Sequence, residues 1–169
     1  NDPSNAITLK NISFAYQKAG TDVLKGVDFT LPLGSSLTIF GVNGSGKSTL
    51  GKLIAGLLLH FRGQIVVLNQ SITEKNYRDV IDKVGIVFQN ADSQFIGEDV
   101  ENDIVFGLEN LNVNPDQMFS RLQSIASRLH IGDILHSEPV NLSAGKKQRV
   151  TIASVLITNP KVVIFDEST

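Results

Sequence analysis

Residues 41–49 read Gly41-Val42-Asn43-Gly44-Ser45-Gly46-Lys47-Ser48-Thr49 and satisfy the pattern G-x-x-x-x-G-K-[ST]. Glycines in such a loop let backbone amides converge on phosphate oxygens, and a helix that follows adds its positive amino-terminal end. Lys47 then reaches the β and γ phosphates as a point charge, and the hydroxyl of Ser48 completes a Mg²⁺ coordination sphere. The alternative is a glycine-rich turn with a solvated lysine. We predict a phosphate-binding loop for a triphosphate with its Mg²⁺.

The residues on either side of this loop have the pattern of a strand and a helix. An apolar run at 37–40 precedes the loop, and apolar residues at helical spacing follow it, namely Leu50, Leu53, Ile54, Leu57 and Leu58. Farther upstream, 7–16 and 27–31 alternate between apolar and polar residues. This alternation predicts two half-buried antiparallel strands.

Downstream of the loop, two further strands and a helical segment are expected. The strands lie at 64–68 and 84–88, with a short helix at 76–82 between them. Between 92 and 141 β-branched runs become rare, which predicts a helical insertion. Asn114-Pro115 begins one helix of this insertion. Its apolar face carries Met118, Leu122, Ile125 and Leu129.

Composition limits the partners and the chemistry. The chain has 169 residues, with 15 Lys and Arg against 17 Asp and Glu and a net charge of -2, so bulk charge gives no case for a nucleic-acid partner. It has no cysteine, which excludes disulfides, thiolate metal sites and thiol nucleophiles. Its longest apolar runs fall far short of the roughly 20 residues that a membrane-spanning helix needs.

Two carboxylates follow the last apolar run of the chain. A helix at 145–158 leads into a buried strand at 162–165, and Asp166-Glu167 comes directly after it. Open α/β sheets bind ligands at this carboxyl edge. Asp166 is expected to hold Mg²⁺, and Glu167 to orient or deprotonate the attacking water. Alone, the pair could equally be a solvated turn, and the phosphate loop upstream favours the functional interpretation.

The segment before the last helix decides between families of nucleotide-binding proteins. It reads Leu142-Ser143-Ala144-Gly145-Lys146-Lys147-Gln148-Arg149-Val150 and resembles the signature of the ABC ATPase family, usually L-S-G-G-Q followed by Q-R-V. The chain departs from that pattern at Ala144 and Lys146. The resemblance implies that Ser143 and the Gly145 backbone contact the γ-phosphate of ATP held by a second ATPase subunit. Ser143 could also be a plain helix N-cap.

Two more positions match this family. Gln89, directly after the strand at 84–88, is similar to the glutamine that touches Mg²⁺ and the attacking water in such ATPases. Tyr16 is similar to the aromatic residue that stacks on adenine. Each has a plainer alternative, since Gln89 could be a surface residue and Tyr16 an ordinary strand aromatic.

Within the family, the chain resembles the ATPase subunits of energy-coupling factor transporters. The resemblance is carried by 89–95 together with Val100, Asp103, Phe106-Gly107 and Glu109-Asn110. It implies a second ATPase subunit, homodimeric or heterodimeric, and an integral membrane component docked on residues 92–106, so that the protein lies on the cytoplasmic face of the membrane. Phe95 and Ile96 could anchor that contact, or could belong to the core of the insertion.

The fold expected from these observations is an α/β P-loop NTPase of the ABC ATPase type. Its predicted parts are an antiparallel β subdomain at 7–31, a P-loop core at 32–90 and 142–169, and an α-helical subdomain at 91–141. Family members continue beyond the position of Thr169, and none of His60, His130 or His136 follows the motif that would make it their switch histidine. We therefore expect this chain alone to bind ATP weakly and to hydrolyse it slowly or not at all.

The function implied is ATP binding and hydrolysis that powers transport of a vitamin or metal ion. One alternative is a soluble ABC ATPase acting on nucleic acid or the ribosome, against which the near-neutral charge argues. The other is a degenerate nucleotide-sensing subunit, indicated by Ala144 and Lys146.

Overall fold

The computed structural model describes residues 2–16, 20–88 and 95–166, which form two compact units. The first unit is Asn1–Val84 and the second begins at Gly85. This division after residue 84 describes how compactly the chain is folded. The predicted division into a β subdomain, a P-loop core and a helical subdomain, with boundaries at 31, 90 and 141, stays a prediction.

An antiparallel sheet forms the base of the first unit, with the strand order β2-β1-β3-β4. The strands are β1 Asn5–Phe14, β2 Leu24–Pro32, β3 Arg62–Val67 and β4 Gln70–Ser71. The predicted strands at 7–16, 27–31 and 64–68 are confirmed, and β3 joins the antiparallel sheet by pairing with β1. Alternate apolar side chains such as Leu9, Ile12 and Ile65 are fully buried, as a half-buried sheet requires.

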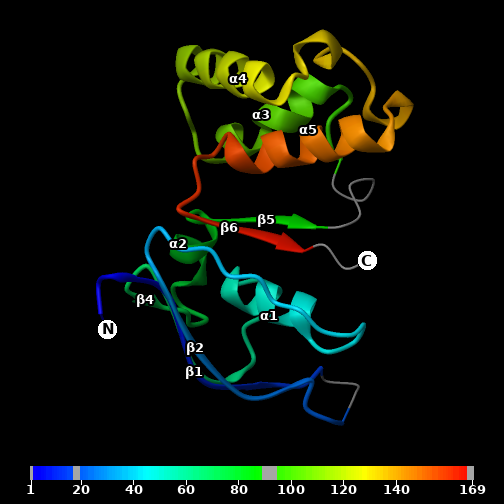
Figure 1. Ribbon diagram of the computed structural model, residues 1–169. Helices are drawn as coiled ribbons and strands as arrows, with labels where there is room; N and C mark the ends of the chain where they lie inside the picture. Colours follow the sequence, from blue (N-terminus) through cyan, green and yellow to red (C-terminus); the bar gives the residue numbers. More distant parts are fainter. Residues whose placement is uncertain (1, 17–19, 89–94, 167–169) are drawn as a thin grey trace. The chain divides into compact units, whose positions relative to one another are not determined.

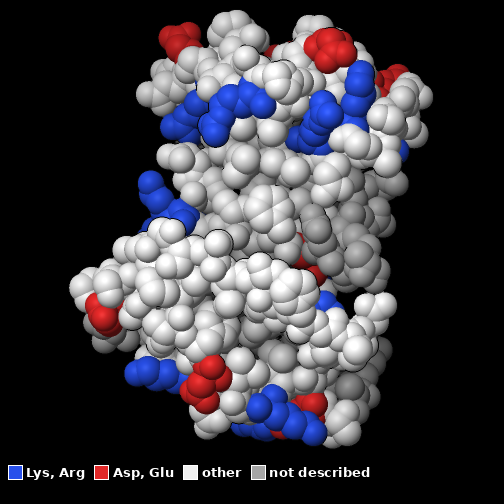
Figure 2. All heavy atoms as spheres, viewed as in Figure 1, with Lys and Arg blue, Asp and Glu red and all other residues white. Residues whose placement is uncertain are grey.

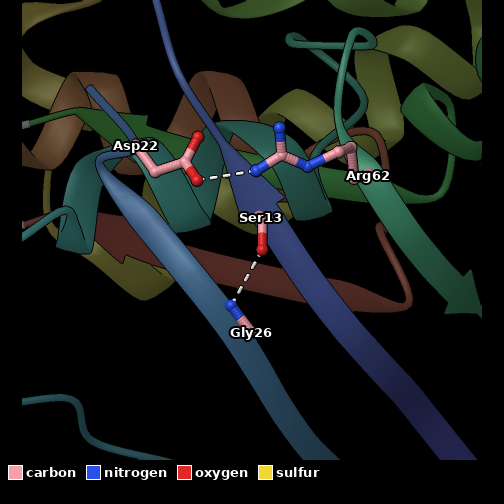
Figure 3. A network of polar contacts seen from close by, with 4 residues as sticks. All are labelled: Ser13, Asp22, Gly26 and Arg62. Atoms are coloured by element: carbon pink, nitrogen blue, oxygen red, sulfur yellow. Dashed lines mark hydrogen bonds and ion pairs between the residues drawn. The ribbon is translucent and has the colours of Figure 1, made fainter. Parts of the chain in front are cut away.

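Polar contacts fix the register at one end of this sheet (Figure 3). The pairing of β1 with β2 shifts between Leu9 and Ile12, and the amide of Gly26 donates a 2.9 Å hydrogen bond to Ser13 Oγ. Nearby, Arg62 Nη2 lies 2.6 Å from Asp22 Oδ2 and joins the start of β3 to the β1–β2 loop. Because the Arg62 side chain is mostly exposed, this ion pair orients the loop more than it stabilises the sheet.

Two helices accompany the sheet, α1 Lys47–Ile54 and α2 Tyr77–Ile81, and both were predicted. The strand predicted at 37–40 is wrong, because these residues belong to no helix or strand and their apolar side chains are exposed, Phe40 at 90%. A strand needs a hydrogen-bonded neighbour, and within the described ranges no strand pairs with this run. Apolar composition alone therefore did not make a strand here.

The second unit is mainly helical, as predicted for the insertion. It contains α3 Val100–Asn110, α4 Pro115–Leu129, the 3-10 turns η2 Gly132–Ile134 and η3 Pro139–Asn141, and α5 Ala144–Leu156. Asn114 caps α4 by accepting a hydrogen bond from the Asp116 amide, with Pro115 at the first helical position. Leu122, Ile125 and the α5 residues Val150 and Ala153 meet in one buried cluster with α3.

A two-stranded sheet of β5 Val84–Phe88 and β6 Val162–Asp166 completes the described structure. The two arrows point the same way in Figure 1, so β5 and β6 run parallel. The expectation that β6 is fully buried is wrong, since Val162 and Ile164 are half-buried and Phe165 is exposed. Among the described residues β6 pairs only with β5, so one of its edges has no strand beside it.

Candidate functional site

The predicted phosphate loop lies directly before α1 in the first unit. Residues 41–45 are exposed, and Gly46 is buried and occupies the N-cap position of α1. The Ser45 amide donates a 3.2 Å hydrogen bond to the Val42 carbonyl, which closes a turn around Asn43 and Gly44. Loop and helix therefore follow each other as a phosphate-binding loop requires.

Gly46 is the residue that fixes this arrangement. Its φ of 94° is left-handed, and a Cβ built on it would fall 2.8 Å from Leu24 Cδ2 and 3.3 Å from the carbonyl oxygen of Val23. The backbone conformation favours glycine, and a side chain would require Leu24 and the Val23 carbonyl to shift. The start of β2 thus sets the position of the first turn of α1, which is a contact that the motif does not reveal.

The Lys47 side chain folds back over the loop. Its ammonium donates hydrogen bonds to the carbonyl oxygens of Gly41, at 2.7 Å, and Val42, at 3.0 Å. These bonds hold the positive charge beside the loop instead of leaving it extended into solvent. The role of Lys47 in binding phosphate stays a prediction.

Tyr16 lies beside the same helix. Its hydroxyl oxygen is 3.1 Å from Oγ1 of the buried Thr49, and its ring meets Phe14 edge-on with the ring centroids 4.9 Å apart. Two contacts thus orient the ring, of which a large part stays exposed. The structure brings Tyr16 to α1, and its stacking on adenine stays a prediction.

The chemistry of this unit fits a triphosphate with Mg²⁺. The N-cap of α1 is a glycine and makes no side-chain capping bond, so no cap side chain takes up the first amides of the helix. In the described ranges no group of three or more His, Cys, Asp or Glu could hold a metal. Mg²⁺ usually takes few protein ligands and keeps waters and phosphate oxygens. Ser48 is the residue of the loop that would bind it.

The second unit carries the signature segment at the start of α5. Ser143 is the N-cap residue, but its side chain makes no capping hydrogen bond, so the plain N-cap alternative is not what the structure shows. Ala144 is the first helical residue, and its φ is not positive, so its methyl group causes no backbone strain. A Cβ on Gly145 would meet nothing within 4 Å. Lys146 lies 3.3 Å from Asp133 of η2.

The remaining predicted residues follow the strands of the second unit. Asp166 is the last residue of β6 and is half-buried. Gln89 and Glu167 lie outside the described residues. The structure therefore brings Tyr16, Lys47, Ser48 and Thr49 together in the first unit, and it puts Ser143 and Asp166 on elements of the second.

The comparison with known proteins now decides the family. A profile described as ABC transporter matches residues 24–169, which include the phosphate loop, the signature segment and the two carboxylates. The chain belongs to the ABC transporter family. The predicted fold class, an α/β P-loop fold of the ABC ATPase type, is thereby confirmed.

Individual relatives of this ABC family chain are energy-coupling factor proteins. It is 43% identical over 168 residues to the energy-coupling factor transporter ATP-binding protein EcfA1 of Lactobacillus johnsonii, covering 98% of this chain and 60% of that protein. EcfA1 of Staphylococcus aureus strain MRSA252 is 45% identical, with coverages of 99% and 62%. A solved structure of cbiO1 from Clostridium perfringens, part of the ABC transporter complex cbiONQ, matches with a TM-score of 0.86 at 32% identity, covering 97% of this chain and 66% of that one. The chain thus spans less than two thirds of the length of each of these relatives.

The space around Gly46 predicts a specific loss of stability. Gly46→Ala adds a methyl group that meets Leu24 and the Val23 carbonyl, whereas Gly34→Ala also has a positive φ, of 73°, but open space around it. We expect Gly34→Ala to cost about 1 kcal/mol of unfolding free energy for its backbone conformation, and Gly46→Ala to cost clearly more. Chemical denaturation of both variants measures this. Equal losses would show that β2 does not constrain the loop.

Proposed function

We propose that this protein is the ATP-binding and ATP-hydrolysing subunit of an energy-coupling factor transporter for a vitamin or metal ion. The observation that carries the proposal is the phosphate loop of residues 41–49, held at the N-terminus of α1 by Gly46 and enclosed by the Lys47 side chain. The relatives named EcfA1 support the kind of transporter. Their names refer to ATP binding, which agrees with the chemistry of the loop.

Each residue of the first unit has a distinct task in this proposal. Gly41, Val42, Asn43, Gly44, Ser45 and Gly46 surround the phosphates with backbone amides. Lys47 exchanges its two carbonyl partners for the β and γ phosphate oxygens, at small cost because the ammonium already lies beside the loop. Ser48 binds Mg²⁺, which neutralises phosphate charge when bound. Thr49 holds the hydroxyl of Tyr16, whose ring stacks on adenine.

Hydrolysis is assigned to residues that follow the strands of the second unit. Asp166 holds Mg²⁺, Glu167 takes the proton of the attacking water, and Gln89 orients that water and the metal. Ser143 and the Gly145 amide approach the γ-phosphate bound by a second ATPase subunit. The lack of a capping bond at Ser143 supports this role, because its hydroxyl is not used to cap α5.

The membrane partner is proposed from the relatives and from one exposed side chain. Among the described residues no helix has the length and apolar composition needed to cross a bilayer. Ile96 is 71% exposed next to the start of α3, whereas the neighbouring Phe95 packs against the buried cluster. Ile96 is therefore the better candidate anchor for an integral transporter component docked on 92–106, which would place the protein on the cytoplasmic face of the membrane.

The alternatives have less support. Figure 2 shows Lys and Arg side chains on the viewed face in small separate groups, with Asp and Glu near several of them. This distribution gives no reason to prefer a nucleic-acid or ribosomal partner. The nucleotide-sensing alternative rests on Ala144 and Lys146. Ala144 adds no backbone strain, and Lys146 has an acidic partner in Asp133, so neither change disrupts the start of α5.

Replacing Glu167 separates an ATPase from a sensor. In the full-length protein we expect Glu167→Gln to lower ATP turnover by at least about 100-fold, because general-base catalysis is lost, while bound ATP stays trapped. Turnover and retained nucleotide are measured together. Glu109→Gln, an exposed carboxylate at the end of α3, is the matched control. Unchanged turnover in Glu167→Gln would favour the sensor.

Co-purification with membranes tests the partner. We expect full-length protein to sediment with membranes only when its integral component is co-expressed, and Ile96→Glu to abolish this because a buried charge at the contact is costly. Phe119→Glu, on α4 at 63% exposure and outside 92–106, is expected to sediment like the unchanged protein. Sedimentation of Ile96→Glu at the unchanged level would exclude Ile96 as the anchor.

A further inference from the structure

A buried carboxylate on α3 takes no part in the nucleotide chemistry described above. Asp103 is only 7% exposed, and its interactions in the described structure are with neutral groups. Oδ1 accepts hydrogen bonds from the amides of Ile96, at 2.7 Å, and Gly97, at 3.2 Å. Oδ2 accepts a 3.3 Å bond from the hydroxyl of Ser154 on α5. One side chain therefore joins the turn before α3 to the signature helix.

Asp103 is not needed to cap α3. The amides of Val100 and Glu101 donate to the carbonyl oxygens of Ser137 and Leu135, and the amide of Asn102 donates to the side chain of Asp99. The first orphan donors of the helix are thus already satisfied. The burial of Asp103, which is costly for a carboxylate, is explained by the turn and by α5 instead.

The turn itself fits closely against α3. A Cβ on Gly97 would lie 2.5 Å from the Asp103 amide nitrogen and 2.9 Å from the Asp99 carbonyl oxygen. Both neighbours are backbone atoms that cannot move aside. The backbone at Ile96 and Gly97 is therefore in direct contact with the helix, while the Ile96 side chain faces solvent.

The other end of the connection is firmly part of α5. The single hydrogen of the Ser154 hydroxyl is shared between Asp103 Oδ2, at 3.3 Å, and the Val150 carbonyl oxygen, at 3.0 Å. Val150 and Ala153 are fully buried. Helix α3 lies against α5 and the residues just after it, because a Cβ on Gly107 would lie 3.8 Å from the Ser154 carbonyl oxygen and 2.9 Å from Thr158 Cγ2. Asp103 therefore contacts the helix whose N-cap is Ser143 and whose first turn carries Gly145.

We propose that Asp103 is a positioning residue that couples the turn at Ile96 and Gly97 to α5 through Ser154. A force on the exposed Ile96 side chain passes through two amide hydrogen bonds to Asp103, and from Asp103 to the helix that begins at the signature. The functional role of this coupling rests on the proposed function, in which a membrane partner contacts Ile96 and ATP contacts Ser143. The coupling itself concerns the second unit alone.

Three substitutions distinguish coupling between the turn and α5 from a purely local stabilisation of the turn by Asp103. Asp103→Ala removes all three bonds. Ser154→Ala removes the bond between α5 and Asp103, together with the Ser154 bond to the Val150 carbonyl inside α5, and it favours the helix by propensity. Asp103→Asn is the matched rescue, since its amide oxygen still accepts from Ile96 and Gly97. Its NH₂ donates to Ser154, whose single hydrogen then goes to the Val150 carbonyl.

Amide hydrogen exchange in the full-length, nucleotide-free protein provides the test. We expect Asp103→Ala to speed exchange at Ile96 and Gly97 by about tenfold or more, as loss of charged hydrogen bonds implies. Ser154→Ala should speed exchange at the same two amides by a smaller factor, although its change lies on α5, and Asp103→Asn should match the unchanged protein. If Ser154→Ala leaves both amides unchanged, Asp103 is a local clamp and the proposal is overturned.

A second measurement with Mg·ATP keeps this test apart from that of the proposed function. In the unchanged protein and in Asp103→Asn, we expect nucleotide to alter exchange at Ile96 and Gly97, and in Ser154→Ala we expect that response to be lost. A response of equal size in Ser154→Ala overturns the coupling. If nucleotide changes exchange nowhere, not even at 44–50, the proposed function fails, while the nucleotide-free comparison still decides the coupling.

Discussion

The backbone of Gly46 enters α1 in a left-handed conformation, and its α-carbon lies so close to Val23 and Leu24 that a side chain would require both to shift. This contact positions the junction between the loop of residues 41–45 and α1. It thereby sets the direction in which the amides of the first helical turn point. The positions of the Lys47 and Thr49 side chains depend on the same contact, because both residues lie in the first turn of α1. Lys47 reaches back to two loop carbonyls, and Thr49 reaches the hydroxyl of Tyr16. A phosphate site made mostly of backbone depends on such a constraint, since it has few side chains to hold it in place.

The second unit holds its chemistry by a different means. There Ser143 and Asp103 lie on helices that share one apolar cluster, in which Ile104, Leu108 and Val150 are fully buried. Ser143 is the N-cap of α5, which packs in this cluster. Asp103 binds both α5 and the turn at Ile96 through hydrogen bonds. Ile96, proposed to meet a membrane partner, and Ser143, proposed to meet the ATP bound by a second subunit, therefore belong to the same compact unit. Packed elements of this kind transmit displacements because they are not easily deformed.

Much of this could be predicted from the sequence, because local rules decided it. Asn114-Pro115 capped α4 as expected, and the alternating apolar residues of β1 faced the core. The phosphate motif placed its helix correctly, since glycine, lysine and serine at fixed spacing have few other uses. No residue pattern contains the missing capping bond of Ser143 or the φ of Ala144, which is not positive, and these came from the structure.

What could not be predicted depended on neighbours distant in sequence. The run at 37–40 and the strand β6 have similar apolar composition, yet one forms no strand and the other is only half-buried. Hydrogen-bonded partners decide both outcomes, and composition does not specify them. The close contact of Gly46 with β2 and the burial of Asp103 were missed for the same reason. The proposed roles of Gln89 and Glu167 lie outside the described residues and stay predictions.

The central claim is that backbone amides fixed by Gly46 and the ammonium of Lys47 bind a triphosphate. Titrating isotope-labelled full-length protein with Mg·ATP while following its amide resonances tests this most directly. We expect the largest shifts at residues 44–49, and their loss in Lys47→Ala but not in Lys52→Ala on the same helix. Saturating shifts elsewhere, with 44–49 unmoved, would contradict the account.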